Sequence, residues 1–268
     1  MQKRLEFRVK LNKMKKILSF LGISIQTGYS NLKSLRWYLS DYNKLKKQLF
    51  GRADFPFSKP FPILHEKYDD GGITNGHYFH QDLLVAQKIF NNKPLKHVDV
   101  GSRTDGFVAH IAAFREIEVF DIRTLNVQID NIKFVQADFM KQDTALGLYT
   151  DSISCLHAIE HFGLGRYNDT IDADGHIRGL NTIYHTLKQG GKFYFSTPIG
   201  PQRIEFNAHR VFSIQYLLDL FKGKYSIDSF SFIDDSGDLH KDIELTKAMI
   251  ESNCDCTYGC CVFELTKI

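Results

Sequence analysis

The stretch His97–Gly106, HVDVGSRTDG, constrains the fold of this chain more than any other part of the sequence. His97–Val100 is short, largely apolar and β-branched, as a buried parallel strand should be. Gly101 and Gly106 permit backbone geometry and close approaches that a side chain would block. Apolar side chains in residues 107–112 then recur at helical spacing. The stretch therefore predicts a strand, a tight glycine turn and a helix whose first amide groups point at a ligand above the sheet edge.

Strand and helix patterns alternate in the rest of the chain. Short apolar runs predict strands at residues 118–121, 132–136, 151–156, 192–196, 225–233 and 258–266. Apolar side chains at helical spacing predict helices at residues 78–90, 175–188 and 212–221, the second of them stopped by Gly190-Gly191. This alternation indicates an α/β fold with a doubly wound, mostly parallel, Rossmann-like sheet whose last strand can run antiparallel.

Charge is distributed unevenly along the chain. Residues 1–52 carry 13 Lys or Arg and 2 Asp or Glu, whereas the remainder carries 21 basic and 29 acidic residues. Apolar side chains along one face of residues 31–50 predict a basic amphipathic helix. Residues 53–76 hold three of the six prolines and a Gly-Gly pair, which is typical of a linker or lid. We therefore expect a basic helical extension at residues 1–52, this linker at 53–76 and the main domain at 77–268.

The composition also excludes some classes of protein. The apolar run at residues 17–25 is too short to span a bilayer, and no clear cleavage site follows it. Five cysteines, four of them near the C-terminus, do not make a secreted disulfide framework, and we expect buried thiols in a cytoplasmic protein. The basic extension is either a solvated helix face or a peripheral contact with an anionic membrane. We expect no nucleic-acid partner because no base-stacking motif accompanies the basic charge.

Three acids fall at the ends of predicted strands, Asp99, Asp121 and Asp138. Ligands of a doubly wound sheet bind at the carboxyl ends of its strands, and Asp121 lies 22 residues beyond Asp99, near the spacing at which an acid takes ribose hydroxyls. Arg103 stands at the middle glycine of G-x-G-x-x-G and would crowd a pyrophosphate. The turn thus favours a nucleoside without a pyrophosphate. S-adenosylmethionine fits, with its ribose at Asp121, its adenine edge at Asp138 and its amino-acid part at the turn.

The motifs Asp99-Val100-Gly101, Asp121, Ala137-Asp138 and Glu160-His161-Phe162 resemble those of class I S-adenosylmethionine-dependent methyltransferases. With HVDVGS at residues 97–102, the longer runs HFGLGRY at 161–167 and FNAHR at 206–210 resemble an uncharacterised, methyltransferase-like family, domain of unknown function 268. The resemblance covers residues 76–266 and implies a seven-stranded sheet, S-adenosylmethionine as cofactor and methyl transfer to a small-molecule or glycan-like acceptor. The cofactor-binding residues that we assign are Asp99, Gly101, Ser102, Arg103, Gly106, Asp121, Asp138, Phe139 and His157.

Side chains after the fourth and fifth predicted strands lie at the same edge of the sheet. We assign catalysis to His161, His209 and Glu160, since a hydroxyl acceptor needs a base with a pKa near neutrality. We assign acceptor binding to Arg166, Tyr167, Asn207 and Arg210. The plainer interpretations are structural histidines, a glutamate that caps a helix, and surface ion pairs.

The segment from His157 to His161 matches H-x-x-E-H, the inverted zinc-protease pattern. Such a site needs both histidines on one helical face, and the neighbouring strand and glycines leave little helix. We therefore expect no metal. Two other functions stay open beside methyl transfer: a non-catalytic nucleoside-binding or scaffold protein, favoured by Arg103, and an NAD-dependent oxidoreductase, disfavoured by the missing glycines.

Overall fold

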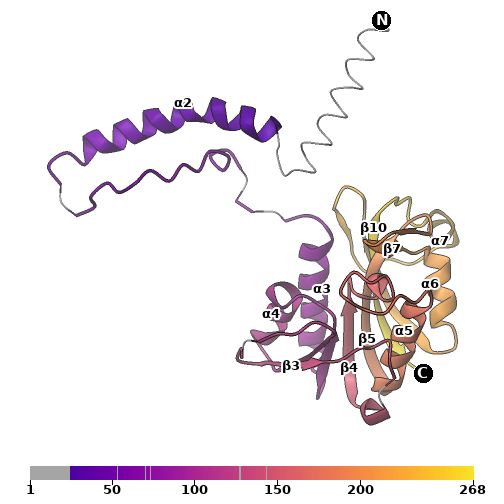
Figure 1. Ribbon diagram of the computed structural model, residues 1–268. Coiled ribbons are helices and arrows are strands. Elements are labelled where there is room, and N and C mark those ends of the chain that lie inside the picture. Colours follow the sequence, from indigo (N-terminus) through magenta and orange to yellow (C-terminus); the bar gives the residue numbers. More distant parts are fainter. Residues whose placement is uncertain (1–24, 53, 70, 73, 127, 143) are drawn as a thin grey trace, which may run out of the picture. The chain divides into compact units, whose positions relative to one another are not determined.

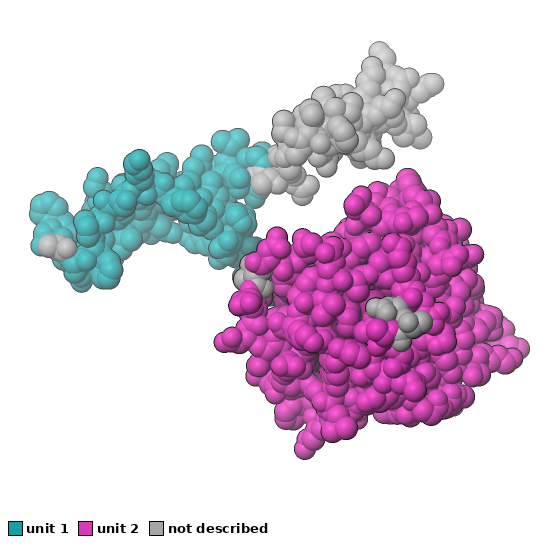
Figure 2. Space-filling model, turned by 60° about the horizontal axis from the view of Figure 1, so that its bottom comes forward, with its two compact units in different colours: residues 1–73 teal, residues 74–268 magenta. Residues whose placement is uncertain are grey.

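The structure is a computed structural model that describes residues 25–52, 54–69, 71–72, 74–126, 128–142 and 144–268. It divides into two compact units, residues 1–73 and residues 74–268 (Figure 2). The basic and apolar residues 13–24 lie outside the described part of the chain. None of the described helices is long and apolar enough to cross a membrane.

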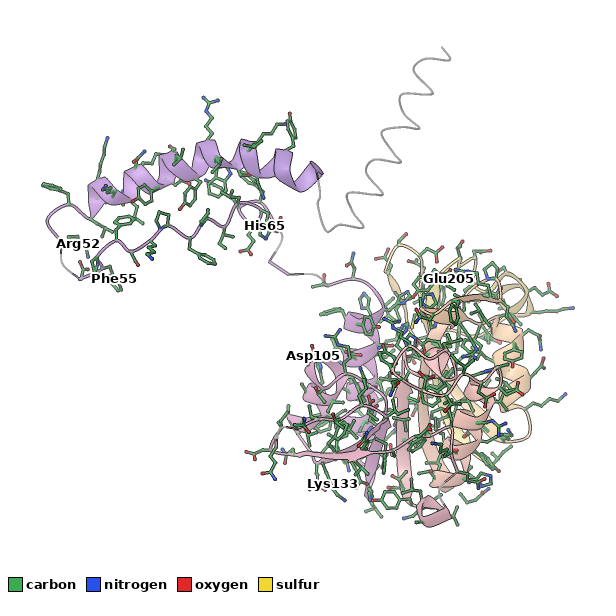
Figure 3. The ribbon with its side chains drawn as sticks, in the orientation of Figure 1. Arg52, Phe55, His65, Asp105, Lys133 and Glu205 are labelled. Atoms are coloured by element: carbon green, nitrogen blue, oxygen red, sulfur yellow. The ribbon has the colours of Figure 1, made fainter. Side chains whose placement is uncertain are left out.

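The first unit is built around helix α2 (Ile25–Gln48). The proline-containing segment that follows runs back along this helix, with Phe55 and His65 on it (Figure 3). Aromatic and basic side chains join the two: the rings of Tyr42 and Phe57 lie 5.0 Å apart, and the ammonium of Lys67 lies 4.3 Å from the Trp37 ring. The apolar stripe that predicted this helix is thus covered only in part, and several of its leucines are exposed.

The second unit is organised by one eight-stranded sheet in the order β3-β2-β1-β4-β5-β10-β8-β9 (Figure 1). Its strands are β1 (His97–Val100), β2 (Ile117–Asp121), β3 (Ile132–Gln136), β4 (Thr150–Leu156), β5 (Leu187–Ile199), β8 (Tyr225–Ile233), β9 (Leu239–His240) and β10 (Gly259–Lys267). The first five strands of this order are parallel, and β10 runs antiparallel to both β5 and β8. The prediction of a doubly wound, mostly parallel sheet is confirmed, including the reversed last strand. The eighth strand is the two-residue β9, which was too short to predict.

Helices cover both faces of this sheet. On one side lie α3 (His77–Asn92), the π-helical turn η1 (Thr104–Val108) and α4 (Ala109–Ala112); on the other lie α5 (Gly175–Thr186), α6 (Ile214–Phe221) and α7 (Lys247–Ser252) (Figure 1). Two 3-10 turns, η2 (Thr144–Leu146) and η3 (Ile159–His161), are the other helical elements among the described residues of this unit. The core is correspondingly divided: Tyr194 belongs to the cluster that contains α3, whereas its neighbours Phe193 and Phe195 belong to the cluster that contains α5 and α6. Alternate strand residues therefore feed opposite cores, as a two-faced sheet requires.

Two predicted boundaries are wrong. The helix at 175–188 ends at Thr186, and Gly190-Gly191 lie inside β5, which begins at Leu187. The cause is an irregularity in the pairing of β4 with β5, where Thr150 faces Leu187 but Ser152 faces Lys192. A bulge of this kind admits extra residues without ending the strand, and Gly190 adopts a φ of 73° within it.

A short hairpin that the sequence did not predict follows β5. It consists of β6 (Arg203–Glu205) and β7 (His209–Val211), paired antiparallel and separate from the main sheet. The hairpin carries the FNAHR motif across the edge of the sheet, so it brings His209 close to the loop that follows β4.

All five cysteines are free and buried, as predicted. Cys260 and Cys261 are consecutive in β10 and belong to the two different core clusters. They therefore face opposite sides of the sheet.

Candidate functional site

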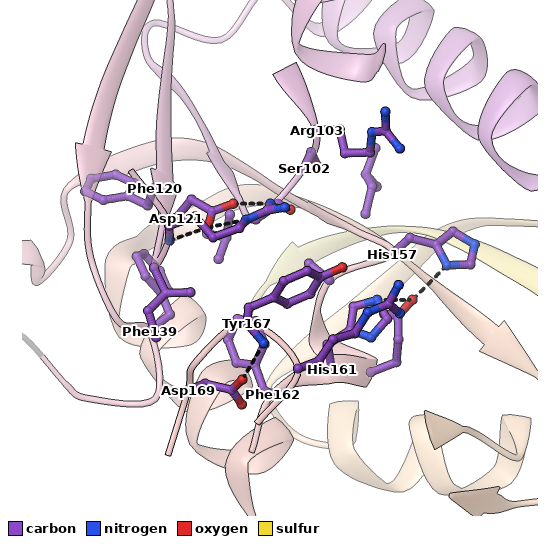
Figure 4. A pocket seen from close by; sticks show the side chains of 18 of the residues that line it. Ser102, Arg103, Phe120, Asp121, Phe139, His157, His161, Phe162, Tyr167 and Asp169 are labelled. Carbon is purple, nitrogen blue, oxygen red and sulfur yellow. Dashed lines mark hydrogen bonds and ion pairs between the residues drawn. The ribbon is translucent and has the colours of Figure 1, made fainter. Parts of the chain in front are cut away.

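A cavity of about 910 Å³ lies over the carboxyl ends of β1, β2 and β4. Its wall is formed by the turn after β1, by residues 120–125 at the end of β2, by residues 137–140 after β3, and by the loop that follows β4. His209 and Tyr258 contribute from β7 and from the residue before β10. Figure 4 shows Asp121 and Phe139 on one side of this cavity and His157 and His161 on the other. The cavity is therefore where the sheet geometry predicts a ligand.

The turn after β1 is held from below by a buried carboxylate. Asp99 accepts hydrogen bonds from the amide and the hydroxyl of Ser102, both at 2.9 Å, and from the hydroxyl of Ser154. Burial raises the pKa of Asp99 to about 6. Asp99 does not line the cavity, so its position supports the turn rather than a direct contact with a ligand.

Gly101 and Gly106 serve different purposes in this turn. Gly101 has a φ of 79°, and a Cβ placed there would lie 2.8 Å from the Cβ of Ala158. Gly101 thus lets the turn approach the loop after β4 on the cavity wall. Gly106 lies off the cavity, and a Cβ on it would meet the Asp82 carboxylate of α3 at 2.9 Å. The assignment of Gly106 to cofactor binding is therefore corrected: Gly106 faces Asp82 of α3 and does not line the cavity.

Arg103, at the position of the missing glycine, lies on the cavity rim. Its guanidinium makes a two-point ion pair with the exposed Asp105 carboxylate, at 2.9 and 2.6 Å. This side chain is exposed and already paired with Asp105. It therefore forms part of the cavity wall at the turn and does not block the cavity.

The acids at the ends of β2 and β3 both reach the cavity. Asp121 accepts from the amide of Arg123 at 2.8 Å and from its Nε at 2.9 Å, and its other oxygen pairs with the same guanidinium. Asp138 accepts from the amide of Met140 at 3.0 Å, and its other carboxylate oxygen lies 3.3 Å from the Nζ of Lys141. Phe139 is buried against Phe120, with ring centres 5.4 Å apart. Arg123 is a site residue that the sequence reasoning missed, although it stands only two positions after the acid.

The loop after β4 carries a buried His–Glu pair. His157 adopts a φ of 49°, and its Nδ1 lies 2.7 Å from a carboxylate oxygen of Glu160. The second oxygen of Glu160 lies 3.4 Å from the hydroxyl of Thr197. Burial opposes ionisation of Glu160, but the imidazole of His157 and its hydrogen bond outweigh it and lower the pKa of the carboxyl. Glu160 is therefore an ionised group that holds His157 in one orientation.

His161 points into the same cavity but is separate from the His157 pair. Its Nδ1 donates to the carbonyl of Ala208 at 2.6 Å, and its Nε2 is 3.9 Å from Glu160, too long for a hydrogen bond. Burial lowers the pKa of His161. Residues 159–161 form only a 3-10 turn, so the two histidines of H-x-x-E-H do not share a helical face.

The glycine-rich loop and the hairpin separate the predicted acceptor residues into two groups. Arg166 and Tyr167 line the cavity, where Asp169 fixes their loop by accepting from the amides of Gly163, Gly165 and Tyr167. Asp169 is a second residue that was missed.

Asn207 and Arg210 do not line the cavity. The buried guanidinium of Arg210 donates to the carbonyl oxygens of Phe162 at 2.6 Å and Ala173 at 3.2 Å, with longer bonds to Glu160 and Asp172. The assignment of Arg210 to acceptor binding is corrected, because its guanidinium N–H groups donate to backbone carbonyls of the loop after β4.

Aromatic side chains close the cavity from outside the predicted set. Tyr78 at the start of α3 and Tyr258 before β10 both line it. The Tyr258 ring lies 5.1 Å from the ring of His209, and burial raises the pKa of Tyr258 to about 12. These positions had no sequence signal, because each follows from packing between segments that are distant in the sequence.

The family model described as Caenorhabditis protein of unknown function, DUF268, matches residues 108–267. The chain belongs to this family. The resemblance to DUF268 is thereby confirmed over more than half of the sequence. The match to this DUF268 chain includes Asp121, Asp138, the His157–Glu160 pair and the hairpin. The turn after β1 lies before the matched residues. None of the curated proteins matches the chain.

Several solved structures are similar in fold to this DUF268 chain. The Burkholderia thailandensis 1,6-didemethyltoxoflavin-N1-methyltransferase, with bound S-adenosylhomocysteine, is 14% identical, with 70% of this chain and 78% of that chain covered and a TM-score of 0.48. The N-methyltransferase NodS from Bradyrhizobium japonicum, in complex with S-adenosylhomocysteine, is 10% identical, with 72% and 88% covered and a TM-score of 0.48. The cyclase SpnF is 12% identical, with 70% and 80% covered and a TM-score of 0.49. At identities this low, the similarity concerns the fold alone.

Proposed function

We propose that residues 74–268 bind S-adenosylmethionine in the cavity and transfer its methyl group to a small-molecule or glycan-like acceptor. The observation that supports this most directly is that Gly101, Asp121 and Asp138 line one cavity. Their strands β1, β2 and β3 are neighbours in the sheet, so the glycine turn and the two carboxylates are presented side by side. This arrangement suits a nucleoside that carries no pyrophosphate.

The residues present fit such a cofactor. The Asp121 carboxylate can accept both ribose hydroxyls, and the Asp138 carboxylate can accept the amino group of adenine. Ser102, Arg103, Phe139 and His157 line the same cavity and complete the cofactor side. The volume of about 910 Å³ lies at the upper end of the range for small-molecule sites, which leaves room for an acceptor beside the cofactor.

S-adenosylmethionine supplies, when bound, a methyl carbon that is open to direct displacement. The chain itself has to position the acceptor and take its proton. The Nε2 of His209 has no hydrogen-bond partner among the described residues and lies 3.4 Å from a Glu205 carboxylate oxygen. The Nε2 of His161 is also left as an acceptor, because its Nδ1 donates to a carbonyl. We assign the base to His209 or His161.

Glu160 takes a positioning role in this proposal. Its two oxygens face His157 and Thr197 rather than the acceptor, so it orients His157. Arg166 and Tyr167 remain the residues that we assign to the acceptor, since both line the cavity and the Arg166 guanidinium lies 5.2 Å from the Tyr167 ring.

A non-catalytic nucleoside-binding or scaffold protein is the second candidate. The scaffold alternative is favoured by the Arg123 guanidinium, which already occupies the Asp121 carboxylate. A ribose has to share this acid or displace Arg123 from it.

Calorimetric titration with S-adenosylmethionine, S-adenosylhomocysteine and NAD tests the proposal. We expect the first two to bind and NAD not to bind. The Asp121→Ala variant should bind S-adenosylmethionine about 30- to 1000-fold more weakly, because two hydrogen bonds to a charged group, each about 1.5–3 kcal/mol before non-additivity, are lost. Asp219→Ala is the matched control, since Asp219 is an exposed carboxylate on α6. Equal affinities in the two variants would remove the support for a bound nucleoside.

Methyl-labelled cofactor incubated with a low-molecular-mass cell extract separates the two candidates. Label that moves to a small molecule with wild-type protein supports the enzyme. Without any transfer of label, cofactor binding supports a non-catalytic nucleoside-binding protein, and the absence of cofactor binding supports a scaffold protein.

A further inference from the structure

Three side chains from distant parts of the sequence converge beside the cavity. His77 begins α3, His157 follows β4, and Cys260 lies in β10. One nitrogen or sulfur atom from each of them lies within 4.8 Å of the other two. We propose that His77, His157 and Cys260 form a binding site for a divalent metal ion, with Zn²⁺ as its occupant.

The imidazole of His157 carries the first argument. Its Nδ1 faces the Glu160 carboxylate at 2.7 Å, and a carboxylate only accepts, so Nδ1 bears a hydrogen and the neutral ring has its lone pair on Nε2. The side chain is 4% exposed, and Nε2 is a buried atom without a hydrogen-bond partner in the described part of the chain. Buried polar atoms of this kind are few in folded proteins. A metal ion at Nε2 would satisfy it.

The second argument is the environment on the far side of His157. A histidine that ligates a metal usually donates its other ring N–H to a carboxylate, which fixes the tautomer and the ring orientation. The buried Glu160 does this here. The backbone amide of His157 also donates to the carbonyl of Ser196 at 3.1 Å, so the residue is held at both ends.

The donor set selects the metal. Two imidazoles and one thiolate suit Zn²⁺, whereas Ca²⁺ and Mg²⁺ prefer oxygen ligands. The sulfur of Cys260 is buried, and its nearest polar contacts are weak, at 3.4 Å to the Cys261 carbonyl and 3.9 Å to Gln81. The rings of His77 and His157 lie nearly parallel, at 16° with centres 5.2 Å apart.

A bound ion would tie the start of α3 to the β4 loop and to β10. Three protein ligands leave a fourth tetrahedral position, and His157 also lines the cavity, so the site adjoins it. His157 belongs to both sites, because it also lines the cavity on the proposed cofactor side, whereas Asp121 and Asp138 take no part in the metal site. The proposed metal site replaces the expectation that the protein binds no metal. The first histidine of the H-x-x-E-H motif, His157, is one of the three proposed ligands, whereas its second histidine, His161, is not.

Titration of the full-length, metal-stripped protein with Co²⁺ and then Zn²⁺ tests the site. We expect one equivalent of Co²⁺ to produce a thiolate-to-metal charge-transfer band that Zn²⁺ abolishes. Cys260→Ser should remove the band, and His77→Gln should weaken Co²⁺ and Zn²⁺ binding at least about tenfold. Cys261→Ser and His80→Gln are the matched controls: Cys261 faces the other side of β10, and His80 lies one turn further along α3. Both controls should bind as wild type does.

Three outcomes would overturn the proposal: no charge-transfer band in the wild type, an unchanged band and affinity in His77→Gln, or an equal loss in Cys261→Ser. His77 is only partly buried at a helix start, so His77→Gln keeps the test decisive if Cys260→Ser fails to fold. No S-adenosylmethionine is present in these titrations. Failure of the metal site is therefore distinguishable from failure of the proposed methyl transfer.

Discussion

The Asp121 carboxylate at the end of β2 is bound by the guanidinium and the amide of Arg123, two residues further along the chain. The Asp121 side chain is 6% exposed and that of Arg123 is 40% exposed. The Arg123 guanidinium also lies 4.7 Å from the ring of Tyr167 on the facing loop. Any ligand that uses Asp121 therefore competes with Arg123, and the ion pair connects the predicted cofactor side to the predicted acceptor side.

Replacing Arg123 should make cofactor binding tighter. A partly exposed ion pair contributes about 0.5–1 kcal/mol, so Arg123→Ala should raise the affinity for S-adenosylmethionine about 2- to 5-fold. Calorimetric titration measures this. Arg178→Ala is the control, because Arg178 is an exposed arginine that also pairs with an aspartate, Asp172, but does not line the cavity. A weaker affinity in Arg123→Ala would mean that the guanidinium contacts the cofactor instead of competing with it.

Removing the His209 imidazole should leave the cofactor side intact. His209 reaches the cavity from β7, away from Asp121 and Asp138, so His209→Ala should keep the affinity for S-adenosylmethionine within about threefold, or under about 1 kcal/mol. Transfer of the labelled methyl group should be strongly reduced if His209 is the base. Losses of affinity as large as those in Asp121→Ala would place His209 on the cofactor side.

Gly101 should tolerate no side chain. Gly101→Ala adds about 1–2 kcal/mol for an L-residue at a φ of 79° and about 1–3 kcal/mol for the contact with Ala158. Gly223→Ala is the control, since Gly223 has a φ of 71° but nothing within 4 Å of an added Cβ. Urea denaturation should show a larger loss of unfolding free energy for Gly101→Ala. Equal losses would show that the turn can move away from Ala158.

His97 should make the fold sensitive to acid. The ring is buried between the hydroxyls of Ser152 at 2.8 Å and Ser154 at 3.2 Å, and burial lowers the pKa of His97 to about 3. The unfolded chain takes up a proton near pH 6.5 while the folded state does not, so this contribution to stability is present above pH 6.5 and is lost as the pH falls toward 3.

The loss that this histidine causes between pH 6.5 and pH 5 is roughly 2 kcal/mol. The His97→Gln variant lacks this proton uptake and can still hydrogen bond to both serines. The difference in unfolding free energy between wild type and variant should therefore shift toward the variant as the pH falls. A difference that does not change with pH would contradict the assigned pKa.

The second unit should fold without the first. Residues 74–268 contain both hydrophobic clusters and the whole sheet, so a chain of these residues alone should unfold cooperatively in urea. Its midpoint should match the main transition of the full-length protein. A product that is soluble but lacks fixed tertiary packing would show that the main domain needs the N-terminal residues.

Local patterns in the sequence determined the elements and their direction. Strands β3 and β8 fall at the predicted residues because short apolar runs encode them directly. Parallel pairing then places the carboxyl ends of strands together, which is why the sequence alone assigns Asp121, Asp138 and the Gly101 turn to one edge of the sheet. Gly190-Gly191 in β5 led to the wrong prediction of a helix end, since a glycine pair marks a helix end and a strand bulge equally well.

Tertiary packing alone determined which hydrogen-bond partners the buried polar groups have. Nothing in the spacing of FNAHR distinguishes an arginine that faces a ligand from Arg210, whose donors satisfy the carbonyls of a loop. Gly106 lies against the Asp82 carboxylate of α3, which no local pattern predicts. His157 lies near His77 and Cys260 only because α3, the β4 loop and β10 pack together. Helical and strand periodicity is a property of neighbouring residues, whereas the satisfaction of a buried hydrogen-bonding group depends on which distant segment packs against it.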